Sequence, residues 1–113
     1  MINSKRNEIE TKAILDSIDH WTRMIDWVKT QPKNNWTNFF RMGREIKESW
    51  YGVDCALCKI YIEECKKCPL YKLGNRCLNS NSIWRKICRS HNWKEWLYWA
   101  YRMRATLKRL IND

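Results

Sequence analysis

The stretch that decides the fold is residues 92–110, NWKEWLYWAYRMRATLKRL. Apolar residues recur in it at alternating intervals of three and four, which places them on one face of a helix. These residues are Trp93, Trp96, Ala100, Met103, Leu107 and Leu110. Asn92 followed by Glu95 has the spacing of a capping box, so the helix should begin here. We expect the stripe to lie in the core, with a seam between two copies of a homodimer as the alternative.

A matching stripe near the start of the chain predicts a helix over residues 7–30. Its members are Ile14, Ile18, Trp21, Ile25 and Val28. Pro32 should end this helix, because proline cannot continue the backbone hydrogen bonds. The two stripes should pack against each other. His20 lies beside the first stripe, so we interpret it as a structural histidine.

Two shorter helices are predicted between these long ones. The first covers residues 35–50, and its apolar stripe comprises Trp36, Phe39, Phe40, Ile46 and Trp50. Gly43 falls on this stripe and either allows a close approach between helices or merely weakens the helix. The second covers residues 82–89, with Ile83, Trp84 and Ile87 facing inward.

Residues 52–80 differ from the rest of the chain in composition and pattern, because apolar periodicity is poor and five of the six cysteines lie there. Two C-x2-C pairs indicate a metal site, since zinc takes four thiolate ligands in a tetrahedron. The candidate ligands are Cys55, Cys58, Cys65, Cys68 and Cys77. In one straight helix the first and fourth of these would lie about 20 Å apart along the axis, too far for one ion. Either the chain folds back between the pairs, or the ligands are Cys55, Cys58, Cys68 and Cys77, with Cys65 as the substitute.

An iron–sulfur cluster is the alternative cofactor. Cys68 precedes Pro69, a step that closes the ligand run of some ferredoxins, but the tight C-x2-C-x2-C run is absent, which favours zinc. Cys88 falls in a predicted helix and is interpreted as a buried apolar cysteine. His91 is a minor candidate for a fourth ligand.

Charge is distributed unevenly along the chain, which carries a net +10. Residues 1–54 hold nine Lys or Arg against eight Asp or Glu, whereas residues 55–113 hold thirteen against four. This asymmetry indicates a polyanionic partner for the second half. The predicted binding residues, on the last helix and just before it, are Arg85, Lys86, Arg89, Lys94, Tyr98, Tyr101, Arg102, Lys108 and Arg109. The partner is nucleic acid or an acidic protein, and a merely solvated helix face is the third possibility.

The sequence contains no motif for catalysis: a phosphate-binding glycine loop, an H-E-x-x-H pair and a nucleophile elbow are all missing, so we do not predict an enzyme. It also has no apolar leader and no run long enough to span a bilayer, which predicts a cytoplasmic protein with reduced thiols. The expected fold is all-α and forms a single domain over residues 1–113. It is a small bundle of N- and C-terminal helices with a compact metal-stapled cysteine module inserted. Its parts are a helical pair over 1–50, the cysteine module over 52–80 and a helical segment over 82–113.

The cysteine segment, DCALCKIYIEECKKCPLYKLGNRC over residues 54–77, resembles a family of small uncharacterised phage and prophage proteins. The matching positions are His20, Trp21, Cys55, Leu57, Cys58, Cys65, Cys68, Pro69, Gly74 and Cys77. Residues 81–84 depart from the family's usual continuation, and Cys88 is additional. The resemblance implies a phage origin and a shared metal-type module. Small phage accessory proteins bind nucleic acid or block a host defence system, so the resemblance implies one of these two roles. Nucleic-acid binding is the first, and an anti-defence protein that inhibits a host factor is the alternative.

Overall fold

The computed structural model describes residues 8–50, 56, 61, 68 and 82–112. In these ranges the chain forms four α-helices, namely α1 (Glu8–Val28), α2 (Phe39–Ile46), α5 (Ile83–Cys88) and α6 (Trp93–Asn112). The described residues contain no β-strand, only an isolated antiparallel bridge between Trp36 and Asn92. The prediction of a helical protein is therefore confirmed for the part of the chain that is described.

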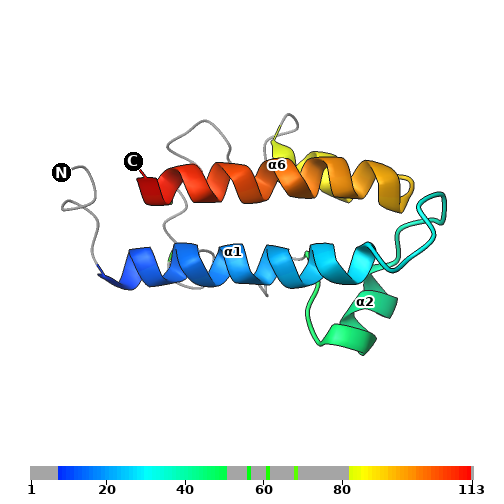
Figure 1. The fold of residues 1–113 in the computed structure, drawn as a ribbon, viewed down its shortest axis with the longest axis horizontal. Helices are drawn as coiled ribbons and strands as arrows, with labels where there is room; N and C mark the ends of the chain where they lie inside the picture. Colours follow the sequence, from blue (N-terminus) through cyan, green and yellow to red (C-terminus); the bar gives the residue numbers. More distant parts are fainter. Residues whose placement is uncertain (1–7, 51–55, 57–60, 62–67, 69–81, 113) are drawn as a thin grey trace.

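The two long helices, α1 and α6, lie side by side and run in opposite directions (Figure 1). The predicted stripe of α6 is buried along its whole length, from Trp93 to Leu110. On α1 the predicted stripe is buried as well, except that Ile18 is only partly covered. Both helices therefore form because each has one apolar face to bury, and the core interpretation of the α6 stripe is confirmed.

The predicted second helix was too long, because α2 spans only residues 39–46. Asn38 caps its N-terminus by accepting the Arg41 N–H, and Lys47 ends it in the left-handed conformation, with φ of 64°. The predicted stripe was also partly wrong. Trp36 precedes the helix and is 78% exposed, and Phe40 is 70% exposed.

The buried residue of α2 is Met42, which was not part of the predicted stripe and is fully enclosed. A Cβ placed on Gly43 would meet no atom within 4 Å. No described residue makes the close approach to Gly43 that the sequence was considered to allow, so within the described part of the chain the glycine only weakens α2.

Tryptophan fills the centre of the core where the helices meet. Trp21, Trp50, Trp93 and Trp96 are all buried, and the Trp50 ring lies 6.0 Å from that of Trp93 and 5.6 Å from that of Trp96. Trp84 of α5 donates its indole N–H to the Trp50 carbonyl at 2.6 Å. These rings join the segment after α2 and helix α5 to the long-helix pair, and large aromatic side chains stabilise a small core strongly.

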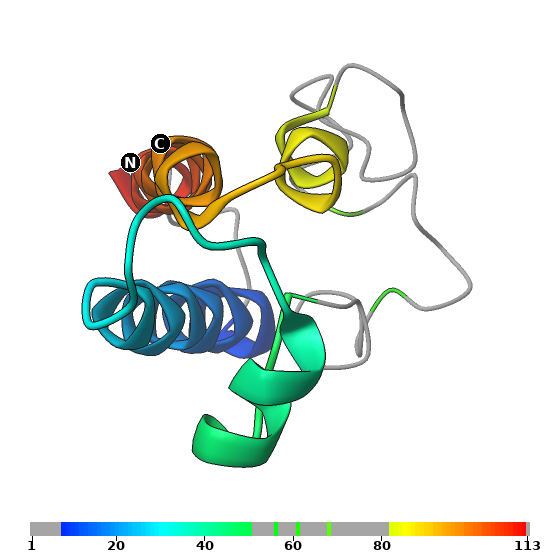
Figure 2. The same ribbon diagram turned by 90° about the vertical axis from the view of Figure 1, so that its right-hand side faces the viewer.

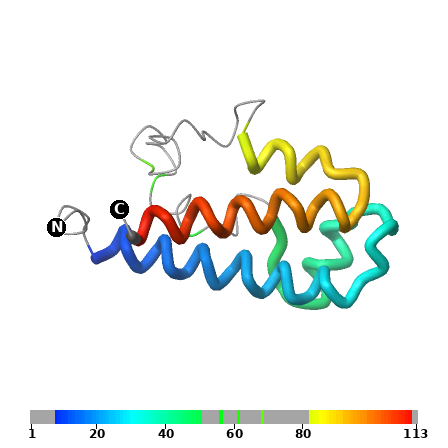
Figure 3. The backbone as a smooth tube through the Cα atoms, turned by 45° about the horizontal axis from the view of Figure 1, so that its top comes forward, coloured from blue at the N-terminus to red at the C-terminus, as the bar shows by residue number. Residues whose placement is uncertain are grey.

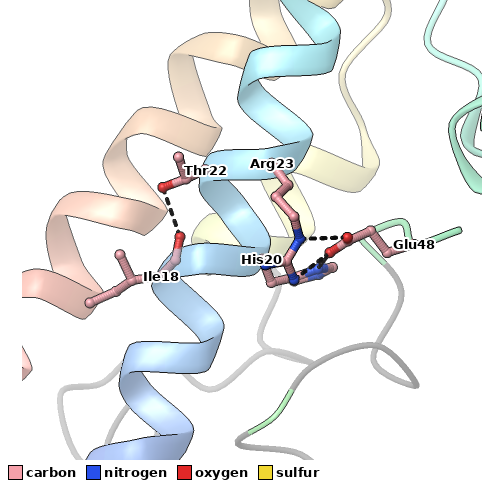
Figure 4. Close-up of polar contacts among 5 residues, drawn as sticks. All are labelled: Ile18, His20, Thr22, Arg23 and Glu48. Atoms are coloured by element: carbon pink, nitrogen blue, oxygen red, sulfur yellow. Dashed lines mark hydrogen bonds and ion pairs between the residues drawn. The ribbon is translucent and has the colours of Figure 1, made fainter. Parts of the chain in front are cut away.

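A polar contact fixes the segment after α2 on α1 (Figure 4). Glu48 accepts two hydrogen bonds from the Arg23 guanidinium, at 2.7 and 3.0 Å, and lies 2.5 Å from Nδ1 of His20. The His20 residue is only 5% exposed, which confirms its structural interpretation. Burial alone would raise the Glu48 pKa, but the hydrogen bonds from Arg23 and His20 outweigh it and hold that pKa below its ordinary value.

Helix α5 confirms the prediction over residues 82–89. The Ser82 hydroxyl caps its N-terminus by accepting the Arg85 N–H at 3.1 Å, and Ile87 is buried. α6 contacts α1 on one side and α5 on another, as the end-on view and the tube trace show (Figures 2 and 3). The part of α6 that α1 leaves uncovered is therefore bordered by α5.

Candidate nucleic-acid interface

The two C-terminal helices concentrate positive charge. Residues 82–112 hold eight Lys or Arg and one acidic residue, Glu95. The Glu95 carboxylate accepts the backbone N–H of His91 at 2.7 Å and lies 3.8 Å from Nδ1 of the same residue. Its own N–H donates to the Asn92 side chain at 2.9 Å, which confirms the predicted cap of α6. Positive charge therefore outweighs negative charge by seven over residues 82–112.

A short connection brings α5 alongside the first turns of α6. The Arg89 N–H closes α5 on the Arg85 carbonyl, and the Asn92 cap starts α6 three residues later. The turn between them leaves an open groove of about 610 Å³ along the two helices. The basic side chains that line it are Lys86, Arg89 and Lys94.

Two aromatic rings line this groove beside the cations. Tyr98 and Trp99 both line it, and their rings meet edge to face at 4.9 Å. Lys86 Nζ lies 4.5 Å from the Trp99 ring centre, and Arg102 lies 5.4 Å from the Tyr98 ring and 5.8 Å from the Trp99 ring. Cations at these distances are attracted by the face of the ring, which holds them beside the groove.

The ion pairs among the described residues do not involve three of the cations around the groove. Within the described part of the chain, the salt bridges engage Lys12, Arg23, Arg41 and the two histidines, and none engages Lys86, Lys94 or Arg102. A phosphate that contacts these three cations therefore would not have to break an ion pair with another described residue.

The remaining predicted binding residues extend the surface in other directions. Lys108 and Arg109 are exposed on the last turns of α6. Lys108 lies about 21 Å from Lys94 along the helix axis. Tyr101 does not line the groove, and Nζ of Lys29, the residue after α1, lies 6.0 Å from its ring. Arg85 lies over the Trp84 ring at 5.7 Å. The structure thus gathers Lys86, Arg89, Lys94, Tyr98 and Arg102 around one groove, and leaves Arg85, Tyr101, Lys108 and Arg109 outside it.

Sequence reasoning missed five of the residues that line the groove, namely Ser90, His91, Asn92, Glu95 and Trp99. Trp99 is off the apolar stripe of α6 and next to Tyr98, which would have marked it as a candidate. His91 was considered only as a metal ligand, but it lines the groove and its side chain is 79% exposed.

The cysteine module lies mostly outside the described residues. Of the predicted zinc ligands, Cys55, Cys58, Cys65 and Cys77 fall outside them, and Cys68 is partly buried against the hydrophobic core. No group of three or more potential ligands comes together among the residues that are described. The donor set itself, five thiols within residues 55–77, has the chemistry that zinc prefers.

The prediction for Cys88 was half right. The residue ends α5 as expected, but it is exposed rather than buried. Enough protein surrounds its sulfur that desolvation raises the thiol pKa, against the lowering effect of Arg85 and Arg89. A raised pKa favours the protonated thiol at neutral pH, which makes Cys88 a poor nucleophile.

Comparison with known proteins gives no relative: no family model matches the chain, and neither a curated protein nor a solved structure matches it. Of the helices described here, none is both long enough and apolar enough to cross a membrane.

Proposed function

We propose that this chain is a phage-encoded, metal-stapled accessory protein that binds nucleic acid through the groove between α5 and α6. The observation that supports this function is the position of Lys86, Lys94 and Arg102 around the Tyr98 and Trp99 rings, with no internal ion pair on any of the three cations in the described chain. Phosphates need cations that are free to release counterions, and bases need flat rings. The groove offers both within one surface.

Charge reversal tests this function. In the double variant Lys94→Glu and Arg102→Glu, affinity for labelled DNA or RNA oligonucleotides at low salt should fall at least tenfold, because two phosphate contacts become repulsive. The matched control is Lys12→Glu with Arg44→Glu, which changes the net charge equally on exposed positions of α1 and α2. Fluorescence anisotropy measures both variants.

Equal weakening by the two double variants would contradict the proposal, because it would mean that overall charge, not the groove, attracts the oligonucleotide. A wild-type protein that binds no oligonucleotide at low salt would contradict it as well. Capture of an acidic host protein that survives nuclease treatment would then indicate the anti-defence alternative, in which the same cations dock a protein.

The metal is a separate part of the proposal. Zinc held by the cysteines of residues 55–77 would stabilise a chain with a small core, since binding of a structural zinc ion contributes directly to folding. Elemental analysis with a thiol count should give about one zinc per chain and a colourless protein. Iron with visible absorption would instead identify a cluster.

A further inference from the structure

The loop before α2 carries a tryptophan that the core does not use. Trp36 is 78% exposed, the most exposed of the large hydrophobic side chains among the described residues. Fully exposing so large an apolar ring is unfavourable in water, and nothing in the packing of the four helices requires it. Its position is nevertheless fixed.

Hydrogen bonds on both sides of Trp36 attach this loop to the start of α6 and to the turn before it. The Trp93 N–H donates to the Asn35 carbonyl at 3.1 Å, and the Lys94 N–H donates to the Lys33 carbonyl at 3.0 Å. On the other side, the Thr37 hydroxyl donates to the Ser90 carbonyl at 3.1 Å. The first amides of a helix lack partners within the helix, so the loop satisfies them. The backbone that carries Trp36 is thereby held against the start of α6, while its indole ring remains accessible.

The Trp36 ring borders the groove. Trp36 forms the isolated bridge with Asn92, and its ring lies 6.4 Å from that of His91. Both His91 and Asn92 line the groove. The exposed indole therefore continues the surface that begins with the cations of α5 and α6, with the exposed His91 imidazole between them.

We propose that Trp36 is a stacking platform for an unpaired base, so that the groove prefers single-stranded nucleic acid over a duplex. This inference rests on the proposed function and names its substrate class. A base can stack on an aromatic side chain only when it is not already stacked inside a helix, and single-strand binding proteins combine a cationic track with such rings. In a paired duplex the bases are covered on both faces, so Trp36 would contribute nothing.

The test compares a single-stranded oligo(dT) of about 16 nucleotides with a blunt duplex of the same length, and oligo(U) is the RNA arm. Trp36→Ala should weaken binding of the single strands about fivefold or more, and change binding of the duplex less than about twofold. Trp36→Phe should keep most of the affinity because it keeps a ring, whereas Trp36→Leu should behave like alanine. The matched control is Phe40→Ala, which removes an exposed ring that does not line the groove.

Each outcome has a definite meaning. Wild-type protein that binds both forms equally, with no effect of Trp36→Ala, would overturn this inference and leave the proposed function intact. Equal loss on single strand and duplex would overturn it too, because that result indicates a structural role for Trp36. Wild-type protein that binds neither form at low salt would overturn the proposed function, and this inference with it.

Discussion

Replacing Glu48 with alanine should destabilise the protein by about 2–3 kcal/mol. The carboxylate joins the segment after α2 to α1 and is only 16% exposed. Its removal leaves Nδ1 of His20 without its partner, on a side chain that is 6% exposed, and an unsatisfied buried polar group costs about 1–3 kcal/mol. Arg23 adds at most about 0.5 kcal/mol, because its side chain is 56% exposed and water can replace the carboxylate.

The matched control is Asp16→Ala on the same helix, α1. The Asp16 carboxylate makes an ion pair with Lys12 at 2.9 Å, but the two side chains are 49% and 77% exposed. Exposed pairs of this kind contribute about 0.5 kcal/mol or less. Both variants remove one paired carboxylate, so the difference between their free energies of unfolding measures the effect of burying the Glu48 pair.

Urea unfolding and thermal unfolding, both followed by circular dichroism, measure the two variants. At about 4 °C per kcal/mol for a domain of this size, Glu48→Ala should lower Tm by about 8–12 °C and Asp16→Ala by about 2 °C or less. Equal and small effects of the two variants would refute the reasoning, because they would show that Glu48 does not fix the segment after α2 onto α1.

Three further predictions concern the same framework. Gly43→Ala should stabilise the protein by about 0.5–1 kcal/mol, because the added methyl meets no atom within 4 Å and alanine favours the helix, and a loss of stability would contradict the open space described there. Ser17→Ala should stabilise the protein by up to about 1 kcal/mol, since the hydroxyl is buried without a hydrogen-bond partner among the described residues. Urea unfolding measures both substitutions, and destabilisation by Ser17→Ala would reveal a partner for the hydroxyl. The pKa of Glu48 is lower in the folded protein than in the unfolded chain, so its contribution is complete above the ordinary carboxylate range and is lost as pH falls through the lowered value. The stability difference between wild type and Glu48→Gln should therefore shrink as the pH falls below the ordinary carboxylate range, and a difference that does not change with pH would mean that the Glu48 charge contributes nothing.

The long helices could be predicted from the sequence, and the reason is physical. A stripe such as Trp93 to Leu110 has a helical period and enough apolar area that only burial satisfies it, so pattern and packing agree. Helix α2 could not be predicted as well, because the apolar residues of 35–50 were assigned to one face although Trp36 and Phe40 are exposed. There the cap at Asn38 decides where the helix begins.

The groove was predicted only in part for a different reason. Lys94, Tyr98 and Arg102 share one face of α6, and a helical wheel finds them. Their meeting with Lys86 depends on how α5 folds back beside α6, which is a tertiary contact without a periodic signal. The position of Trp36 likewise depends on hydrogen bonds between backbone atoms, which side-chain patterns do not encode.

The measurement that tests the central claim most directly is the salt dependence of oligonucleotide binding by the wild-type protein. With Lys86, Lys94 and Arg102 each contacting a phosphate, the logarithm of the affinity for a single strand should fall with the logarithm of salt with a slope of about −2 or steeper. Between about 50 and 200 mM salt this is a loss of about 20-fold. The double variant at Lys94 and Arg102 should have a slope shallower by about 1.4. Binding that does not change with salt, or a slope that the double variant leaves unaltered, would contradict the account.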